Sequence, residues 1–154
     1  MPHLLTRLVR FAAISAWIVL LSGSAYATGD NVLQDELRQT MQKVREGKTT
    51  ASRTEAAESL SGITRRMNPR DVDDEMITDL TRLLDSADDS VRYWVARSLG
   101  NLGTRARASI PALEKLLPKA DCLQGSKTSA SGIRLALTQM GVTPPPPQCG
   151  ADRK

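Results

Sequence analysis

Two cysteines, Cys122 and Cys149, are the side chains of this 154-residue sequence best suited to covalent chemistry. They lack the Cys-x-x-Cys spacing of redox-active pairs, and two thiols without a histidine beside them are too few for a zinc site. We predict a structural disulfide between them. In the chain-entropy model, closing a loop of about 28 residues stabilises the folded state by about 3.5 kcal/mol. We predict no metal ligand and no cofactor.

Groups for acid–base catalysis are scarce. The sole histidine is His3, and a run of acids is best explained as a helix start, where carboxylates complement the helix dipole. This run is Asp71, Asp73, Asp74 and Glu75. The segment 46–50, EGKTT, is similar to the end of a phosphate-binding loop, but Gln42 stands where that loop needs a glycine. We therefore predict no catalytic residue and no enzyme activity.

The first 27 residues have the order of a secretory signal peptide. Arg7 and Arg10 precede an apolar run over 11–21, and small residues precede a cleavage point after Ala27. The apolar run is short for a membrane-spanning helix, which needs roughly 20 residues; an uncleaved membrane anchor is the alternative. We predict a periplasmic or secreted protein with no stable membrane insertion after cleavage.

Cleavage after Ala27 would change the charge and the aromatic content from which we predict the class of partner. Two of the 21 basic residues precede the cleavage point, which leaves 19 against 17 acidic residues and no histidine. Tyr93 and Trp94 are then the only aromatic residues. A weak positive charge and two aromatic rings cannot supply the electrostatic groove and stacking platform of a nucleic-acid binder. We predict no nucleic-acid partner.

Apolar residues after the signal segment recur every three to four positions, the period of amphipathic helices. Helices are predicted over 30–46, 53–67, 72–85, 90–102, 105–117 and 128–140. Ser52 and Glu55 predict a capping box at the second helix. Pro111 predicts a bend or a late start of the fifth helix and Pro118 its end. Residues 28–142 form the helical domain, and 143–154 form a proline-rich tail, extended over Pro144–Pro147.

Internal similarity divides this domain into repeats. Residues 52–60 match 91–99 at an offset of 39, and Leu99-x-x-Leu102-Gly103 recurs as Leu137-x-x-Met140-Gly141. A two-helix unit of this length cannot bury its apolar side alone, so units must stack. The sequence therefore predicts a short solenoid of three helix pairs.

Residues 80–117 resemble the HEAT-like repeats of bacterial proteins, of the kind also found in lyases. The positions that carry the resemblance are Val91-Arg92, Ala96, Leu99-Gly100, Leu102-Gly103 and Ile110-Pro111-Ala112-Leu113. The resemblance implies an all-α, right-handed α-α superhelix. It also implies that Arg53 and Arg92, at equivalent positions, pair with an acid of a neighbouring turn. The last unit lacks the Val-Arg pair, which fits a capping repeat.

Repeats of this kind resemble adaptor modules, which bind proteins on an extended surface. The candidate partner surface is Arg92, Tyr93, Trp94, Arg97 and Arg53, with Tyr93 pointing outward and Trp94 at the edge of the core. We predict a small scaffold or adaptor for a protein partner in the cell envelope, with self-association as a further option. The alternative is a non-catalytic subunit or regulatory module of an envelope enzyme complex.

Overall fold

The computed structural model describes residues 29–123 and 125–149. These residues form α-helices and short 3₁₀ segments and no strand. The helices are α1 (Gly29–Glu46), α2 (Thr50–Arg66), α3 (Asp74–Arg82), α4 (Asp89–Asn101), α5 (Ile110–Ala120) and α6 (Ser129–Gln139). The all-α prediction is confirmed. The predicted signal peptide, residues 1–27, lies outside the described residues.

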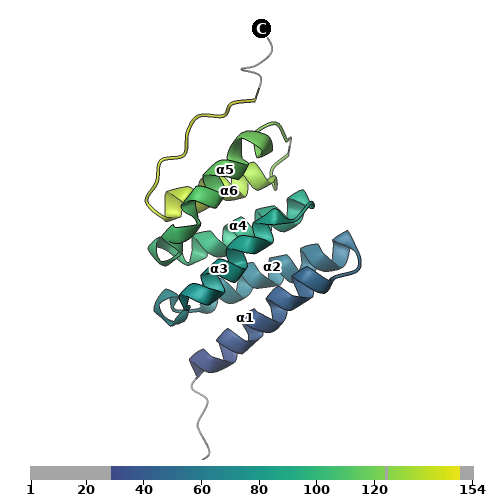
Figure 1. Cartoon of the computed structure of the whole chain (residues 1–154), viewed down its shortest axis with the longest axis vertical. Helices are drawn as coiled ribbons and strands as arrows, with labels where there is room; N and C mark the ends of the chain where they lie inside the picture. The colour runs from purple at the N-terminus through teal and green to yellow at the C-terminus, as the bar shows by residue number, and fades with distance from the viewer. Residues whose placement is uncertain (1–28, 124, 150–154) are drawn as a thin grey trace, which may run out of the picture.

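The helices are arranged as three pairs, stacked along the long axis of the molecule. Figure 1 shows α1, α3 and α5 in one layer and α2, α4 and α6 in the layer behind them. Helix α4 packs between α2 and α6, and contacts within this even-numbered layer are more extensive than those between α1 and α3. The odd-numbered layer is the more open one, with grooves between its helices.

Helix α2 begins earlier than the sequence predicted. Thr49 is the capping residue: its hydroxyl accepts a hydrogen bond from the Ser52 amide at 3.1 Å, and the Ser52 hydroxyl accepts one from the Thr49 amide at 3.3 Å. The predicted pair of Ser52 and Glu55 was therefore wrong by one turn. Thr49 and Ser52 have the same three-residue spacing, and the serine hydroxyl can take the role usually filled by glutamate.

Two further helix boundaries differ from the prediction. Helix α3 is shorter, because Asp73 caps it by accepting from the Met76 amide at 2.7 Å and because residues 83–85 turn as a 3₁₀ segment. Helix α5 has the predicted late start, with Pro111 in its first turn, where a missing amide proton costs little. Pro118 does not end it. The helix continues to Ala120, since one lost hydrogen bond in the last turn is tolerated.

The apolar core runs through the whole stack, with α4 at its centre. Val91, Val95, Ala96 and Leu99 are fully buried on α4, which touches a helix on nearly every side. Positive φ angles end α4 and α6 at Gly103 and Gly141, which occupy equivalent places in two repeats. The repeat period read from the sequence is thus the spacing of one helix pair to the next.

Candidate functional site

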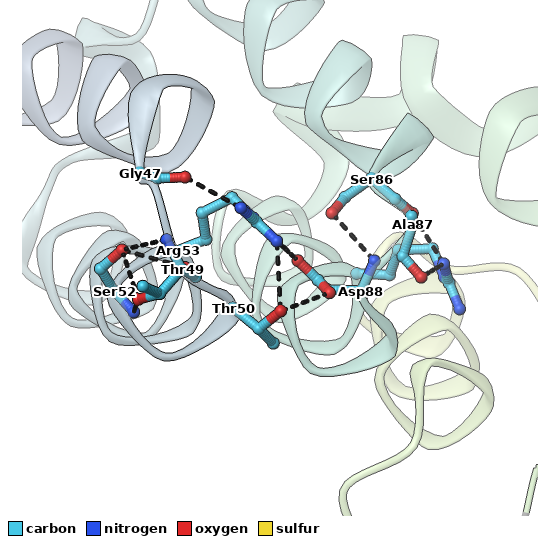
Figure 2. Close-up of polar contacts among 9 residues, drawn as sticks. Gly47, Thr49, Thr50, Ser52, Arg53, Ser86, Ala87 and Asp88 are labelled. Carbon is cyan, nitrogen blue, oxygen red and sulfur yellow. Dashed lines mark hydrogen bonds and ion pairs between the residues drawn. The ribbon is translucent and has the colours of Figure 1, made fainter.

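Arg53 links the first helix pair to the second. Its Nε and Nη2 donate to the Asp88 carboxylate at 2.8 and 2.6 Å, and its Nη1 donates to the Gly47 carbonyl at 2.9 Å. Thr50 completes the contact, because its hydroxyl donates to the other Asp88 oxygen at 3.0 Å. Figure 2 shows the guanidinium lying between Gly47 and Asp88. The predicted pairing of Arg53 with an acid of a neighbouring turn is confirmed.

Arg92 repeats this arrangement one unit further along the chain. Its Nη1 donates to the Ser86 and Ala87 carbonyls at 2.7 and 2.9 Å, and its Nη2 contacts Asp89 Oδ1 at 3.1 Å. The acid partner of Arg92 belongs to the first turn of its own helix, whereas Arg53 reaches an acid of the next repeat. Both arginines therefore fasten the turn before their helix.

Asp89 extends the connection to the third pair. Its carboxylate accepts from the Ser129 amide at 3.1 Å and from the Ser129 hydroxyl at the start of α6. We call the series Arg53, Asp88, Arg92, Asp89 and Ser129 the ladder. It runs along the N-terminal ends of α2, α4 and α6.

The ladder has an electrostatic signature at Asp88. The hydrogen bond from the Arg53 guanidinium, above all, holds the pKa of Asp88 below its ordinary value, and the hydroxyl of Thr50 acts in the same direction. Most donors of Arg53 and Arg92 are used within the chain. Of these two members of the predicted partner surface, Arg53 joins two repeats and Arg92 fastens the turn before its own helix, which leaves the candidate surface to the other three residues.

Tyr93 is buried, so the prediction that it points outward was wrong. Only 8% of it is exposed, because α6 approaches α4 closely at Gly132. A Cβ atom at Gly132 would lie 2.8 Å from the Tyr93 carbonyl oxygen and 3.0 Å from its ring. The glycine was visible in the sequence, but its place opposite Tyr93 follows from the register between two helices.

Trp94 lies at the edge of the core, as predicted, and is partly exposed. Its ring meets Tyr93 edge-on, with centroids 4.8 Å apart. The Lys127 ammonium lies 5.4 Å from the centroid of the Trp94 ring, within range of a cation–π interaction. Lys127 belongs to the loop before α6 and was not part of the predicted surface.

Arg97 is the remaining member of the predicted surface. It lies one turn beyond Trp94 on α4. At helical spacing, one side of that helix keeps some solvent exposure at Ser90, Trp94, Arg97 and Asn101. The Nη1 of Arg97 lies 3.5 Å from the Tyr93 hydroxyl, and its Nε is buried and has no hydrogen-bond partner in the part of the chain that the structure describes. We call Trp94, Arg97, Lys127 and Leu135 the α4–α6 patch.

Leu135 belongs to this patch by its register. It stands at the α6 position equivalent to Arg97, just as Leu137 is equivalent to Leu99, and it is 37% exposed. The sequence analysis missed it. The signal was an apolar residue at a repeat position that elsewhere carries a charge, Glu58 in α2 and Arg97 in α4.

The C-terminal strap, residues 143–149, returns to the last helix pair. The Asp121 side chain is only 3% exposed and receives two donors from Arg134 Nη2, at 2.7 and 2.8 Å. The Gln148 amide donates to the same carboxylate at 3.2 Å, and Arg134 also donates to the Pro145 carbonyl. Sequence analysis missed this anchor, although Arg134 stands where the other two repeats carry Ala57 and Ala96.

The strap brings the neighbours of the two cysteines together. Cys122 follows Asp121, Cys149 follows Gln148, and both cysteines are exposed. The hydrogen bond between Gln148 and Asp121 therefore places these chain segments side by side, as the predicted disulfide requires. The disulfide itself stays a prediction.

Other kinds of site have little support in the described part of the chain. Within residues 29–123 and 125–149, no group of three or more His, Cys, Asp or Glu side chains is placed to hold a metal ion. No helix of the same residues is long and apolar enough to cross a membrane. One hollow lies between α1 and α2 and is lined mainly by charged and hydroxyl side chains.

Comparison with known families agrees with the repeat architecture. Residues 91–117 match the family model of the PBS lyase HEAT-like repeat, which covers α4, the connection after it and most of α5. The chain therefore contains a HEAT-like repeat at the place where the sequence resemblance was strongest. Searches of curated proteins and of solved structures found no match.

Proposed function

We propose that this chain is a small, non-catalytic protein-interaction module of the cell envelope, exported by residues 1–27, which binds its partner on the α4–α6 patch. One observation carries the proposal: a partly exposed tryptophan, Trp94, and an arginine that has no acid partner among residues 29–123 and 125–149, Arg97, lie on the same side of the central helix. Tryptophan and arginine are the residues most enriched where protein interfaces gain their binding energy. HEAT-like repeats commonly mediate protein interactions, which supports the same assignment.

The ladder and the layer packing suit such a module. They hold α4 and α6 in a fixed relation, so the side chains of the patch are positioned before a partner arrives. Binding then costs less conformational entropy than binding by a mobile loop. The absence of histidine after residue 27 supports a binding role over catalysis, because acid–base chemistry near neutral pH most often uses that residue.

Site-specific photocrosslinking in intact cells tests the proposed surface. A photoreactive residue placed at Leu135 should give a discrete adduct with a partner protein, whereas one at Thr78, an exposed position on α3, should not. The adduct at Leu135 should be lost in Trp94→Ala and in Arg97→Gln. Equal adducts at both positions, or none at Leu135, would contradict the proposal.

Export is tested on the same cells. The protein in the envelope fraction should begin at residue 28, which intact mass spectrometry reads directly. A chain that stays in the cytoplasm at full length would overturn the envelope role while leaving the binding surface open to the crosslinking test.

A further inference from the structure

Arg97 differs from the other partly buried arginines in its lack of a counter-charge. Each of the others has a carboxylate oxygen 2.6–3.1 Å from a guanidinium nitrogen: Arg53, Arg92, Arg105 and Arg134. Within the described residues, Arg97 has no carboxylate oxygen within 4.0 Å. An unpaired charge is costly to shield from water, so this guanidinium is the one that gains most from a partner's acid.

The hydrogen-bonding capacity of Arg97 is also largely unused. A guanidinium carries five N–H donors in a planar fork that fits a carboxylate. Here one nitrogen reaches the Tyr93 hydroxyl at a long 3.5 Å, the buried Nε has no partner, and Nη2 has no acceptor among the described residues. Packing on α4 therefore holds the group in place, with Nε shielded from solvent and Nη2 as the nitrogen without an acceptor that a carboxylate can reach.

The surroundings of Arg97 favour an apolar ligand with a single negative charge. Trp94 and Leu135 supply apolar area, and Lys127 adds a second cation that has no ion pair within the described residues. On α2, however, the equivalent repeat positions carry Glu55 and Glu58, both exposed. These acids would repel a polyanion that extended along the even-numbered layer.

From these observations we infer that the α4–α6 patch recognises one aspartate or glutamate within an apolar segment of its protein partner, with Arg97 as the receptor of the carboxylate. The inference rests on the proposed binding function and adds the chemistry of the ligand. Trp94 and Leu135 contact the apolar side chains that flank the acid. Specificity for the acid comes from Arg97, because an amide in its place leaves the guanidinium charge unpaired.

A phage-displayed library of random octapeptides, panned on the full chain, tests the inference. Retained peptides should be enriched in a single Asp or Glu flanked by apolar residues. A retained peptide should then bind at least tenfold more tightly than its counterpart with Asn or Gln, measured by fluorescence anisotropy. In Arg97→Gln this preference should fall below about threefold.

Arg107→Gln is the matched control, because Arg107 is exposed, has no ion pair within the described residues and lies outside the patch. It should keep the preference for the acid. Equal binding of acid and amide peptides, a preference that survives in Arg97→Gln, tighter binding of heparin, or no enrichment at all would overturn the inference. A crosslinked partner at Leu135 combined with any of these results would leave the proposed function standing and remove only its acid specificity.

Discussion

Glycine at position 132 decides how closely α4 and α6 approach. Replacing it with alanine would drive a methyl group into the Tyr93 backbone and ring, at 2.8 and 3.0 Å. We expect Gly132→Ala to lower the free energy of unfolding by about 1–3 kcal/mol, the usual range for overpacking. Urea denaturation followed by circular dichroism measures it.

Gly62 provides the opposite control. It lies inside α2, and a Cβ atom there would have no neighbour within 4 Å. Gly62→Ala should raise stability by about 0.5–1 kcal/mol through lower backbone entropy of the unfolded chain. If the two substitutions shifted stability equally, the close approach at Gly132 would not be the cause.

Asp88 makes stability depend on pH. Because Arg53 holds its folded-state pKa below the ordinary value, this carboxylate stabilises the fold above about pH 4 and loses that contribution as pH falls through its lowered pKa. Asp88→Asn should be less stable than wild type at pH 7, and the gap in Tm should close as the pH falls below about 4.

Arg53→Gln is the partner variant for this test. Like Asp88→Asn, it should show a weaker fall of Tm at acidic pH than wild type. Combining the two substitutions should lower the Tm little further, because both remove one shared contact. Fully additive losses in Tm at pH 7 would show that the two residues act separately.

At the scale of elements, the strap depends on a shielded ion pair. Arg134→Ala would leave the Asp121 carboxylate, 3% exposed, without its main donor and would release Pro145. We expect a loss of about 3 kcal/mol, near the low end for a broken buried pair. Arg66→Ala, which breaks an exposed pair with Glu36, should cost at most about 1 kcal/mol. Chemical denaturation of both variants compares them, and similar losses would contradict a structural role of the strap.

The disulfide prediction belongs to the same element. Oxidation would remove two protons and two electrons from Cys122 and Cys149, which a thiol–disulfide oxidoreductase of an oxidising compartment can accept. Protein from that compartment should show no reactive thiol after denaturation and should lose about 3.5 kcal/mol of stability on reduction. Cys149→Ser should be insensitive to reductant. Two thiols that react fully with a chromogenic disulfide reagent would contradict the bond.

The sequence predicted helices well where apolar spacing and repeat matching coincide, as in α4 and α6. Their apolar residues have to face the core in any stacked arrangement, so the pattern alone is sufficient. Predictions failed where two local solutions were equivalent, as with Thr49 and Ser52 at the start of α2. The prediction for Tyr93 failed because its burial against Gly132 depends on the register between α4 and α6, which the pattern of one helix cannot reveal.

For the whole molecule, the ladder predicts that the array can be lengthened. A tandem copy of residues 77–109, inserted after Ser109, would put Ile77 of the copy in the place of Ile110. Arg92 of the original would then meet the copied Asp88 as Arg53 meets Asp88 now. The longer chain should show more helical signal and a higher Tm, since stability in repeat arrays grows with each interface.

The inserted copy also carries its own control. Asp88→Asn in the copy alone should remove part of the gain in Tm, because the new interface would lose its ion pair. If the insertion lowered the Tm, or if Asp88→Asn in the copy left the Tm of the longer chain unchanged, the ladder would not be the connection between units.

The ladder also distinguishes the third unit from the first two. Each of the first two units presents an arginine, Arg53 or Arg92, but the third has Ala130 at the equivalent position. Ser129 donates the last contact of the ladder to the Asp89 carboxylate. Alanine has no guanidinium to pair with an acid of a further unit, so within the described residues the ladder ends at the third unit.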